Sequence, residues 1–334
     1  PGGMCILPSG EPVVSCHQFF QTPVRVMKLQ DDGKWVPFPN AGMNNPGSGE
    51  PVVLDSVLGL ACDSKGIVWM LDNGRRSDTP PKLVAWDTKR DELHQVIVLH
   101  PQSLSPRSFL KNLVLDPAAP YIYISDPADG ISSAILVVNI RTGLTRRVLE
   151  GHRSTQKEPK VSLQRDGRSI LVRRPDGQLA TPLTGVSPIA IDRKGAWLYY
   201  GPRNGSSLFK IKTEHLRNRQ LNPLNLETQV QGVSPKPICD SMVIDSRGRI
   251  YFADISRGSI DYVSPDEDYL NLRLLIQDPR IVWPGGLLRG PDGNLHFFSN
   301  QLHRTPFFNS GKDVTAPPFS LFKARPLPAG RFGF

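Results

Sequence analysis

The chain has 334 residues, of which 39% are hydrophobic and 21% are charged, an ordinary composition for a globular protein. Forty Lys and Arg residues against 31 Asp and Glu residues give a formal net charge of +9. No apolar stretch approaches the roughly 18 residues that a bilayer span needs, so we expect no membrane partner. No secretory signal is recognisable, and the compartment stays open.

The chain contains 29 glycines and 32 prolines, and they are spread along its whole length. Between them lie short runs of β-branched and aromatic residues, and long amphipathic helical patterns are scarce. This alternation of short apolar runs and turn residues is typical of an all-β protein with many short strands.

One apolar hairpin pattern recurs six times, often with an Asp-x-x-Gly turn between its strands. The copies lie at 2–15, 59–72, 112–126, 187–201, 240–254 and 285–299. A second, more polar hairpin follows most copies, as at 24–38, 82–99, 134–149 and 259–276. Repeats of about 40–50 residues with hairpin signals predict a six-bladed β-propeller, here a single domain over residues 1–334. The apolar hairpin should lie next to the axis and the polar one at the rim.

The interval between the third and fourth copies is longer than the others. We interpret residues 150–184 as a basic hairpin insertion between blades 3 and 4, with turns at Asp166-Gly167 and Asp176-Gly177. Much of the positive charge lies in 141–174, but no aromatic residues interleave with it and acidic residues dilute it. We therefore expect a solvated surface insertion, no nucleic-acid partner, and a monomer.

Closure of the ring is less clear from the pattern. After the sixth copy only residues 320–326 resemble another strand. A three-stranded blade would leave an exposed edge, so we expect a strand upstream of Pro1 to complete it.

Hairpin geometry predicts where a functional site would lie. The first strand of each apolar hairpin leaves one face of the disc and the second returns to it, so strand starts and strand ends meet at one mouth of the channel. The starts contribute Lys111, Asn112, Ser187, Cys239, Asp240, Trp283 and Pro284, and the ends contribute His17, Asp72, Asn73, Asp126, Tyr200, Asp254 and Asn300. Convergent polar groups in one concavity are the default hypothesis for a binding site.

Two residues are the catalytic candidates. Asp240 is a possible general base or cation ligand, and its alternative role is to bind backbone amides at a strand start. Lys111 would orient an anionic substrate, or act as a base if burial lowers its pKa. The candidates for substrate binding are Asn112, Ser187, Tyr200, Trp283, His17, Asp126 and Asn300, although turn formation competes for Asp126 and a structural role for His17. Cys239 has no obvious paired base, and the four cysteines lack metal-ligand spacing.

Several segments resemble the Yellow / major royal jelly protein family, with most similarity to its bacterial members. They are GVSPIAIDRKGAWLYYGPRNGSSLFKIKTEHLRN at 185–218 and GNLHFFSNQLHR at 293–304, with support from 68–75, 124–130 and 236–245. The resemblance implies a six-bladed propeller. It also implies diverse functions, among them dopachrome-converting tautomerases, amine binders and secreted nutritional proteins, on a fold shared with calcium-dependent gluconolactonases.

In the lactonase type, a Glu, an Asn and an Asp hold the metal. Only Asp240 matches here, because the other positions fall at Pro1 or Gly2 and at Ser187 or Pro188. This set is poor for a hard cation, so we expect no metal and no cofactor. Our hypothesis is a metal-independent isomerase, tautomerase or cyclase that acts on an organic, aromatic or natural-product substrate in the central channel. The alternatives are a non-catalytic small-molecule-binding protein and a metal-dependent lactonase-like hydrolase.

Overall fold

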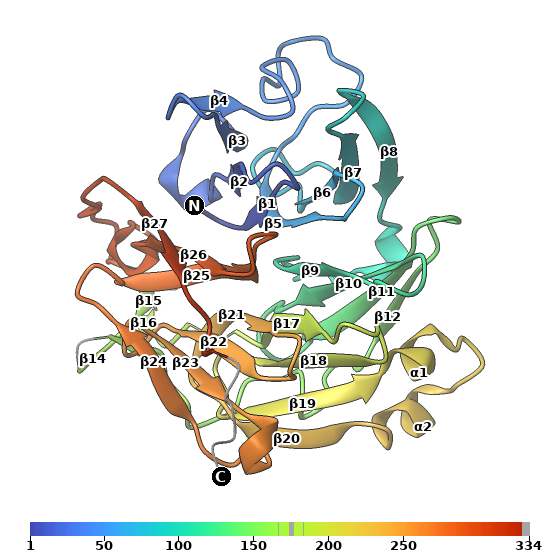
Figure 1. The fold of residues 1–334 in the computed structure, drawn as a ribbon, viewed down its shortest axis with the longest axis vertical. Helices are drawn as coiled ribbons and strands as arrows, with labels where there is room; N and C mark the ends of the chain where they lie inside the picture. Colours follow the sequence, from blue (N-terminus) through green and yellow to red (C-terminus); the bar gives the residue numbers. More distant parts are fainter. Residues whose placement is uncertain (166, 174–176, 183, 329–334) are drawn as a thin grey trace.

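The computed structural model describes residues 1–165, 167–173, 177–182 and 184–328. Within them, six antiparallel sheets stand around one axis, which confirms the predicted all-β, six-bladed propeller (Figure 1). The blades are numbered in chain order, and their strands are given from the axis outward. The first blade contains β1 (Met4–Ile6), β2 (Pro12–Ser15), β3 (Val26–Leu29) and β4 (Trp35–Pro37), and the second contains β5 (Val57–Cys62), β6 (Ile67–Asp72), β7 (Lys82–Asp87) and β8 (Glu92–Val98). The third contains β9 (Leu113–Leu115), β10 (Tyr121–Asp126), β11 (Ala134–Asn139) and β12 (Thr145–Val148), and the fourth contains β17 (Val186–Ile191), β18 (Trp197–Pro202), β19 (Ser207–Lys212) and β20 (Gln231–Pro235). The fifth contains β21 (Cys239–Ile244), β22 (Ile250–Asp254), β23 (Ser259–Val263) and β24 (Arg273–Gln277), and the sixth contains β25 (Trp283–Arg289), β26 (Leu295–Asn300) and β27 (Ser320–Ala324).

The inner hairpins close as their sequence predicts. In the second blade, the Asp63 carboxylate accepts hydrogen bonds from the backbone N–H groups of Lys65 and Ile67, both at 2.9 Å. Gly66 completes that turn with a φ of +91°, a conformation that residues with a side chain rarely adopt. The turn therefore fixes the register that places β5 at the axis.

Neighbouring blades pack face to face through apolar side chains. Between the second and third blades, Leu71 of β6 and Ile122 and Ile124 of β10 are completely buried in one cluster. Burial of each such side chain contributes roughly 1.5–3 kcal/mol relative to exposure. This packing holds the six inner strands at fixed positions around the channel.

Four of the inner strands carry a β-bulge near their start. The register shifts between Val57 and Leu60 in β5, between Val186 and Ile189 in β17, between Cys239 and Met242 in β21, and between Gly285 and Leu288 in β25. A bulge bends the strand and redirects the side chains within it. Two predicted site residues, Ser187 and Asp240, lie inside such bulges.

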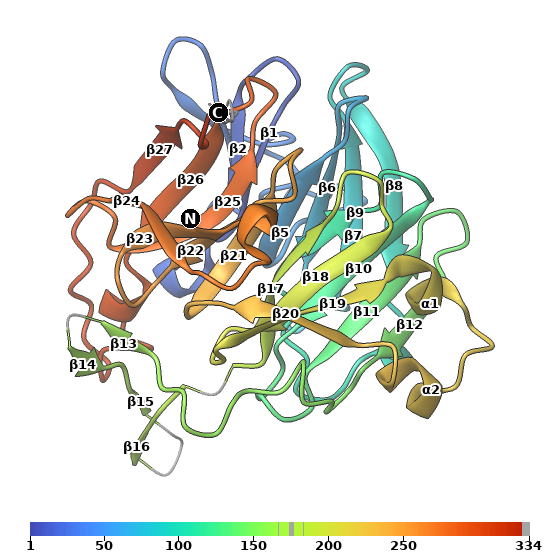
Figure 2. The same cartoon turned by 60° about the horizontal axis from the view of Figure 1, so that its bottom comes forward.

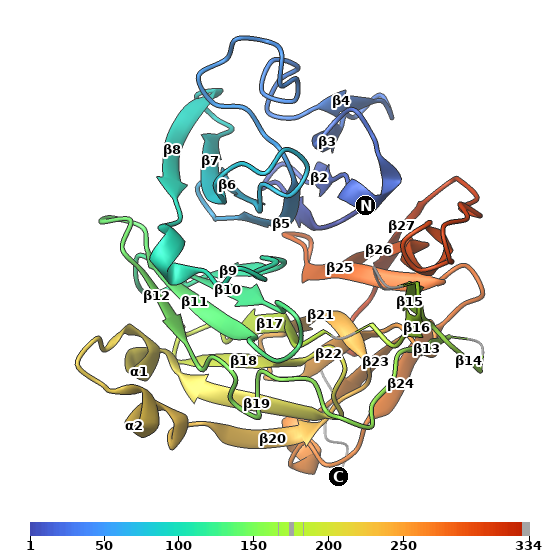
Figure 3. The same ribbon diagram turned by 180° about the vertical axis from the view of Figure 1, so that it is seen from behind.

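The long interval after the third blade contains two small hairpins. They are β13 (Gln164–Arg165) with β14 (Arg168–Ser169), and β15 (Val172–Arg173) with β16 (Leu179–Ala180). Figures 2 and 3 show them outside the six sheets, on one face of the disc beside the fifth and sixth blades. The predicted turn residues Asp166 and Asp176 lie outside the described residues.

Helices are few in the described chain. The two short α-helices, α1 (Thr213–Arg217) and α2 (Pro223–Glu227), lie between β19 and β20. None of the described helices has the length and apolar character needed to cross a membrane. In the sixth blade the described residues form three strands, with β27 outermost.

Candidate functional site

A buried cluster of charged and polar side chains closes the channel. The Lys111 Nζ lies 2.5 Å from the Asp240 Oδ1, and the Ser187 hydroxyl donates to the same oxygen at 3.1 Å. The three residues come from the starts of the third, fourth and fifth blades, far apart in the chain. The structure therefore brings these three predicted site residues together at the axis.

Asn112 ties the backbone of the same three blades together. Its side-chain amide donates to the carbonyl oxygen of Ser187 at 2.8 Å and to that of Asp240 at 2.9 Å. These bonds hold the two bulged strand starts at a fixed distance from the third blade. Asn112 thus fixes the relative positions of the strand starts that carry Lys111, Ser187 and Asp240.

Arg203 is a member of the cluster that our sequence interpretation missed. Its guanidinium lies 3.7 Å from the Asp240 carboxylate, and a second nitrogen donates to the Thr184 hydroxyl. Arg203 follows directly on the last residue of β18, so a search extended by one residue past each strand end would have found it. We call Lys111, Ser187, Arg203 and Asp240 the anchor cluster.

The anchor cluster carries a net positive charge. Desolvation by burial opposes ionisation of Asp240, but the nearby charges of Lys111 and Arg203 outweigh it and hold the pKa of the Asp240 carboxyl well below its usual range. Burial lowers the pKa of Lys111, and the adjacent carboxylate counteracts this. Asp240 is therefore a weak base, and its two cationic partners suit it to anchoring.

His17 stands beside the cluster as a neutral ring. Burial lowers the pKa of its imidazole well below the usual value, and the charge of Lys111 lowers it further. The His17 Nδ1 accepts a hydrogen bond from the Phe19 backbone N–H at 3.2 Å. A neutral ring that accepts at Nδ1 carries its proton on Nε2, so His17 can act as a hydrogen-bond donor.

A cavity of about 520 Å³ opens above the anchor cluster, and we call it the near cavity. Lys111, Arg203 and His17 line its base. Its walls are mainly apolar and aromatic, and they include Phe19, Phe109, Phe307, Phe308, Leu302 and Val172. Two further cations, Arg75 and Arg107, reach its surface. This size and lining suit a small, partly aromatic molecule with a negative charge.

The basic insertion helps to build the near cavity, whereas we expected only a solvated surface. Val172 and Pro182 line the cavity wall. Leu163 and Ile170 are buried in a cluster with Trp283 and Phe308. The Arg165 guanidinium donates to the carbonyl oxygen of Ile255 at 3.2 Å. Apolar anchors and this polar contact fix the insertion over the mouth of the channel.

Two further predicted site residues position the cavity walls. The Asp126 carboxylate accepts from the Phe109 backbone N–H at 2.8 Å and forms an ion pair with Arg147 at 2.6 Å. The Asn300 side chain accepts from the Leu302 backbone N–H at 3.0 Å. Phe109 and Leu302 both line the cavity, so Asp126 and Asn300 act through the loops that they hold.

The remaining two substrate-binding candidates are placed in the core. Tyr200 is completely buried between the third and fourth blades, and its hydroxyl shares a hydrogen bond of 2.9 Å with Ser154. The Trp283 ring stacks on His303 with 5.6 Å between ring centroids and packs against Phe308. Neither lines the near cavity, because each ring faces a neighbouring blade or loop. The near cavity therefore gives no support to their predicted role in substrate binding.

The lactonase metal set does not fit this site. Asp240 is the one carboxylate in the anchor cluster, and its Oδ1 is already paired with the ammonium group of Lys111 at 2.5 Å. In the described part of the chain, no three His, Cys, Asp or Glu side chains gather as possible metal ligands. Burial also raises the pKa of the Cys239 thiol to about 12, which leaves it a poor thiolate donor or nucleophile.

The buried carboxyl groups of Asp254 and Asp261 in the fifth blade allow the effect of carboxylate repulsion on stability to be tested. Burial, with the neighbouring Asp261 as a lesser cause, raises the pKa of Asp254 to about 6, and that of Asp261 is raised as well. A raised carboxyl pKa stabilises the fold below pH 4, and this contribution is lost as the pH rises through about 6. We therefore expect Asp261→Asn to raise the Tm by roughly 1–2 °C at pH 7.5, since about 1 kcal/mol of repulsion is removed from a chain of 334 residues. At pH 4 the gain should disappear.

Thermal unfolding followed by circular dichroism at both pH values measures this effect. Asp266→Asn, on the surface of the same blade, is the matched control and should change neither value. An equal Tm gain at pH 4 and pH 7.5 would contradict carboxylate repulsion as the cause.

Comparisons with known proteins agree with this architecture. The Major royal jelly protein family profile matches residues 55–325. A gluconolactonase from Xanthomonas campestris is 13% identical with a TM-score of 0.54, over 89% of this chain and 82% of that chain. A virginiamycin B lyase from Staphylococcus aureus is 14% identical with a TM-score of 0.49, over 89% of this chain and 90% of that chain. A search of curated protein sequences found no match.

At 13% identity the gluconolactonase structure supports the fold alone, and the family assignment rests on the profile. The profile spans most of the chain, from the start of the second blade to the residue after β27. By that match, the chain belongs to the major royal jelly protein family.

Proposed function

We propose that the near cavity binds a small anionic aromatic molecule and catalyses its isomerisation, tautomerisation or cyclisation without a metal. The observation that carries this proposal is the anchor cluster, in which two buried cations share one carboxylate. One positive charge is left uncompensated at the base of a cavity with aromatic walls. An anionic group of a ligand would neutralise it.

The same charges suit a reaction that passes through an enolate. A proton leaves the carbon next to a carbonyl for water, and negative charge develops on the carbonyl oxygen. Lys111, Arg203 and the Nε2–H of His17 supply donors for that oxygen, and because all three side chains are buried such interactions are strong. Lys111 then donates a proton to the enolate oxygen and regains one from the hydronium ion that the first step formed, which completes the tautomerisation.

Phenylpyruvate tests the proposal, because it is an aromatic carboxylate whose keto–enol exchange can be followed by its absorbance. We expect saturable acceleration of this exchange that is unchanged by EDTA. In parallel, calorimetry should show cinnamate binding at least ten times more tightly than cinnamide, its neutral analogue. Equal binding of the two, or binding of neither, would overturn the proposed ligand class.

Two alternatives are decided by the same experiment. Tight cinnamate binding without turnover of phenylpyruvate or related keto acids would favour a non-catalytic binding protein, which the same cavity would also serve. Lactone hydrolysis that EDTA abolishes would favour a lactonase. The ion pair between Lys111 and the Asp240 Oδ1 argues against that outcome, because it takes up an oxygen that a metal would need.

A further inference from the structure

The channel has a second cavity on the opposite side of the anchor cluster, and we call it the far cavity. Its volume is about 340 Å³, and inner strands of all six blades line it. No described residue lines both cavities. The bridging side chain of Asn112 lies between them, since Asn112 lines the far cavity while its neighbour Lys111 lines the near cavity.

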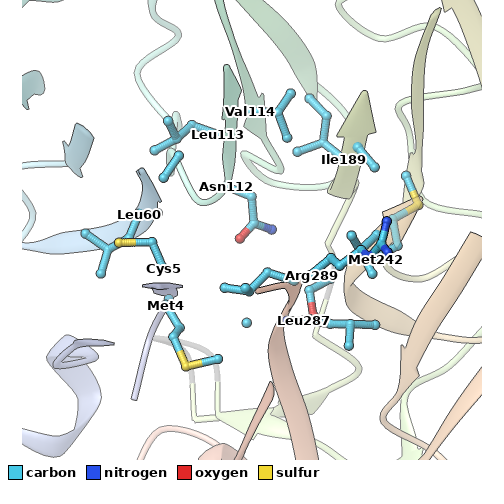
Figure 4. A pocket seen from close by; sticks show the side chains of 18 of the residues that line it. Met4, Cys5, Leu60, Asn112, Leu113, Val114, Ile189, Met242, Leu287 and Arg289 are labelled. Carbon is cyan, nitrogen blue, oxygen red and sulfur yellow. Dashed lines mark hydrogen bonds between the residues drawn. The ribbon is translucent and has the colours of Figure 1, made fainter. Parts of the chain in front are cut away.

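The far cavity presents incompletely buried apolar side chains. Val114, Leu115, Ile191, Val243 and Leu288 line it and retain partial exposure. Figure 4 shows apolar side chains from several blades arranged around Asn112. Apolar surface that converges in a concavity is a feature of ligand sites, because burying it against a ligand is favourable.

Two polar side chains point to the kind of ligand. The Asn112 amide nitrogen is fully used by the Ser187 and Asp240 carbonyls, whereas no described residue donates to its Oδ1. The Ser241 hydroxyl accepts from the Leu287 backbone N–H at 3.1 Å and keeps its own proton available. Apart from the exposed Arg289, whose Nε donates to the Gly293 carbonyl oxygen at 3.3 Å, the cavity offers one side-chain acceptor and one donor within an apolar lining, which matches a hydroxyl group on a hydrophobic body.

We infer that the far cavity is a second binding site, for a small hydrophobic alcohol or phenol. The hydroxyl group donates to Asn112 Oδ1 and accepts from Ser241, and the apolar body lies against the inner strands. This site is independent of the ligand proposed for the near cavity, which is anionic and lies beyond Asn112.

Fluorescence titration with 2-naphthol tests the inference, with 2-methylnaphthalene as the probe that lacks the hydroxyl group. We expect 2-naphthol to bind at least five times more tightly than 2-methylnaphthalene. Val114→Asp should weaken 2-naphthol binding at least tenfold, because it places a carboxylate in the apolar lining. The control Val98→Asp makes the same change on an outer strand, where Val98 is 58% exposed, and should leave binding unchanged.

A near-cavity variant distinguishes the two sites. Phe307→Ala removes an exposed wall of the near cavity, and it should weaken cinnamate binding while leaving 2-naphthol binding intact. If Phe307→Ala weakens 2-naphthol binding and Val114→Asp does not, the inferred far site is wrong. Equal binding of the two probes would overturn the role of Asn112 and Ser241.

A measurement on the unmodified chain covers the case in which Val114→Asp fails to fold. Cys62 lines the far cavity, and Cys16 lies near the opposite mouth. Saturating 2-naphthol should slow labelling of Cys62 by a small mercurial at least fivefold, as measured by peptide mass spectrometry, without slowing that of Cys16. Protection of neither thiol, or of Cys16 alone, would overturn the inference.

Discussion

Asp240→Asn is expected to destabilise the fold by about 3–5 kcal/mol, because it leaves buried cations without their counter-charge. Lys111 and Asp240 are both nearly inaccessible to solvent, and Arg203 shares the same carboxylate. Neutralising the anion therefore leaves two desolvated positive charges side by side. Urea unfolding at pH 7 measures the change, and Asp32→Asn on the surface should leave the midpoint unchanged.

The pH dependence of this loss follows from the lowered pKa of Asp240. A carboxyl group whose pKa is lowered by folding stabilises the fold above its unfolded pKa of about 4, and this contribution is lost as the pH falls through the folded value. The difference between the unmodified chain and Asp240→Asn should therefore be largest near neutral pH and should narrow below pH 4.

A double variant tests the cause. Asp240→Asn combined with Lys111→Met removes one stranded cation and should recover at least half of the lost stability. If the double variant is no more stable than Asp240→Asn alone, uncompensated charge is not the reason for the loss.

Lys111→Met should lower kcat/KM for phenylpyruvate at least 100-fold. The substitution removes the cation that would neutralise both the substrate carboxylate and the developing enolate, and electrostatic groups of this kind commonly contribute two to three orders of magnitude. Asp240 keeps Arg203 and Ser187 as partners in this variant, so the fold should survive. Lys89→Met in an exposed turn is the control and should retain full activity.

The conservative variant and the pH profile separate catalysis from simple positioning. Lys111→Arg keeps the positive charge and should retain more activity than Lys111→Met. Because the active form of Lys111 is the ammonium ion, activity should fall at high pH, at a pKa below the usual lysine value. Full activity of Lys111→Met would refute the proposed role.

Most of the architecture could be predicted from residue patterns, because it depends on local preferences. A tight turn between two short apolar strands favours a hairpin, and six copies of this pattern define six blades. The meeting of Lys111, Ser187 and Asp240 at one mouth follows from the same repetition. The prediction succeeded because strand starts in a propeller share one face of the disc.

Side-chain direction could not be predicted in the same way. Tyr200 lies near a strand end and Trp283 at a strand start, and both satisfy the pattern. Their rings nevertheless turn into the core, where burial of aromatic surface outweighs exposure in the channel. Arg203 and Phe308 line the near cavity, but they lie in the segments that follow β18 and β26. The bulges that contain Ser187 and Asp240 add residues to one strand without a recognisable local signal.

By itself, the sequence determined the fold class, the number of blades and the strand starts that meet at the axis, because turn chemistry and alternating apolar residues act over a few neighbouring positions. The tertiary structure alone decided that Asp240 is held by two cations, that the insertion walls the near cavity and that Asn112 separates two cavities. Those features depend on contacts between residues far apart in the chain, such as the bond from Asn112 to Asp240 across 128 positions, which no local pattern encodes.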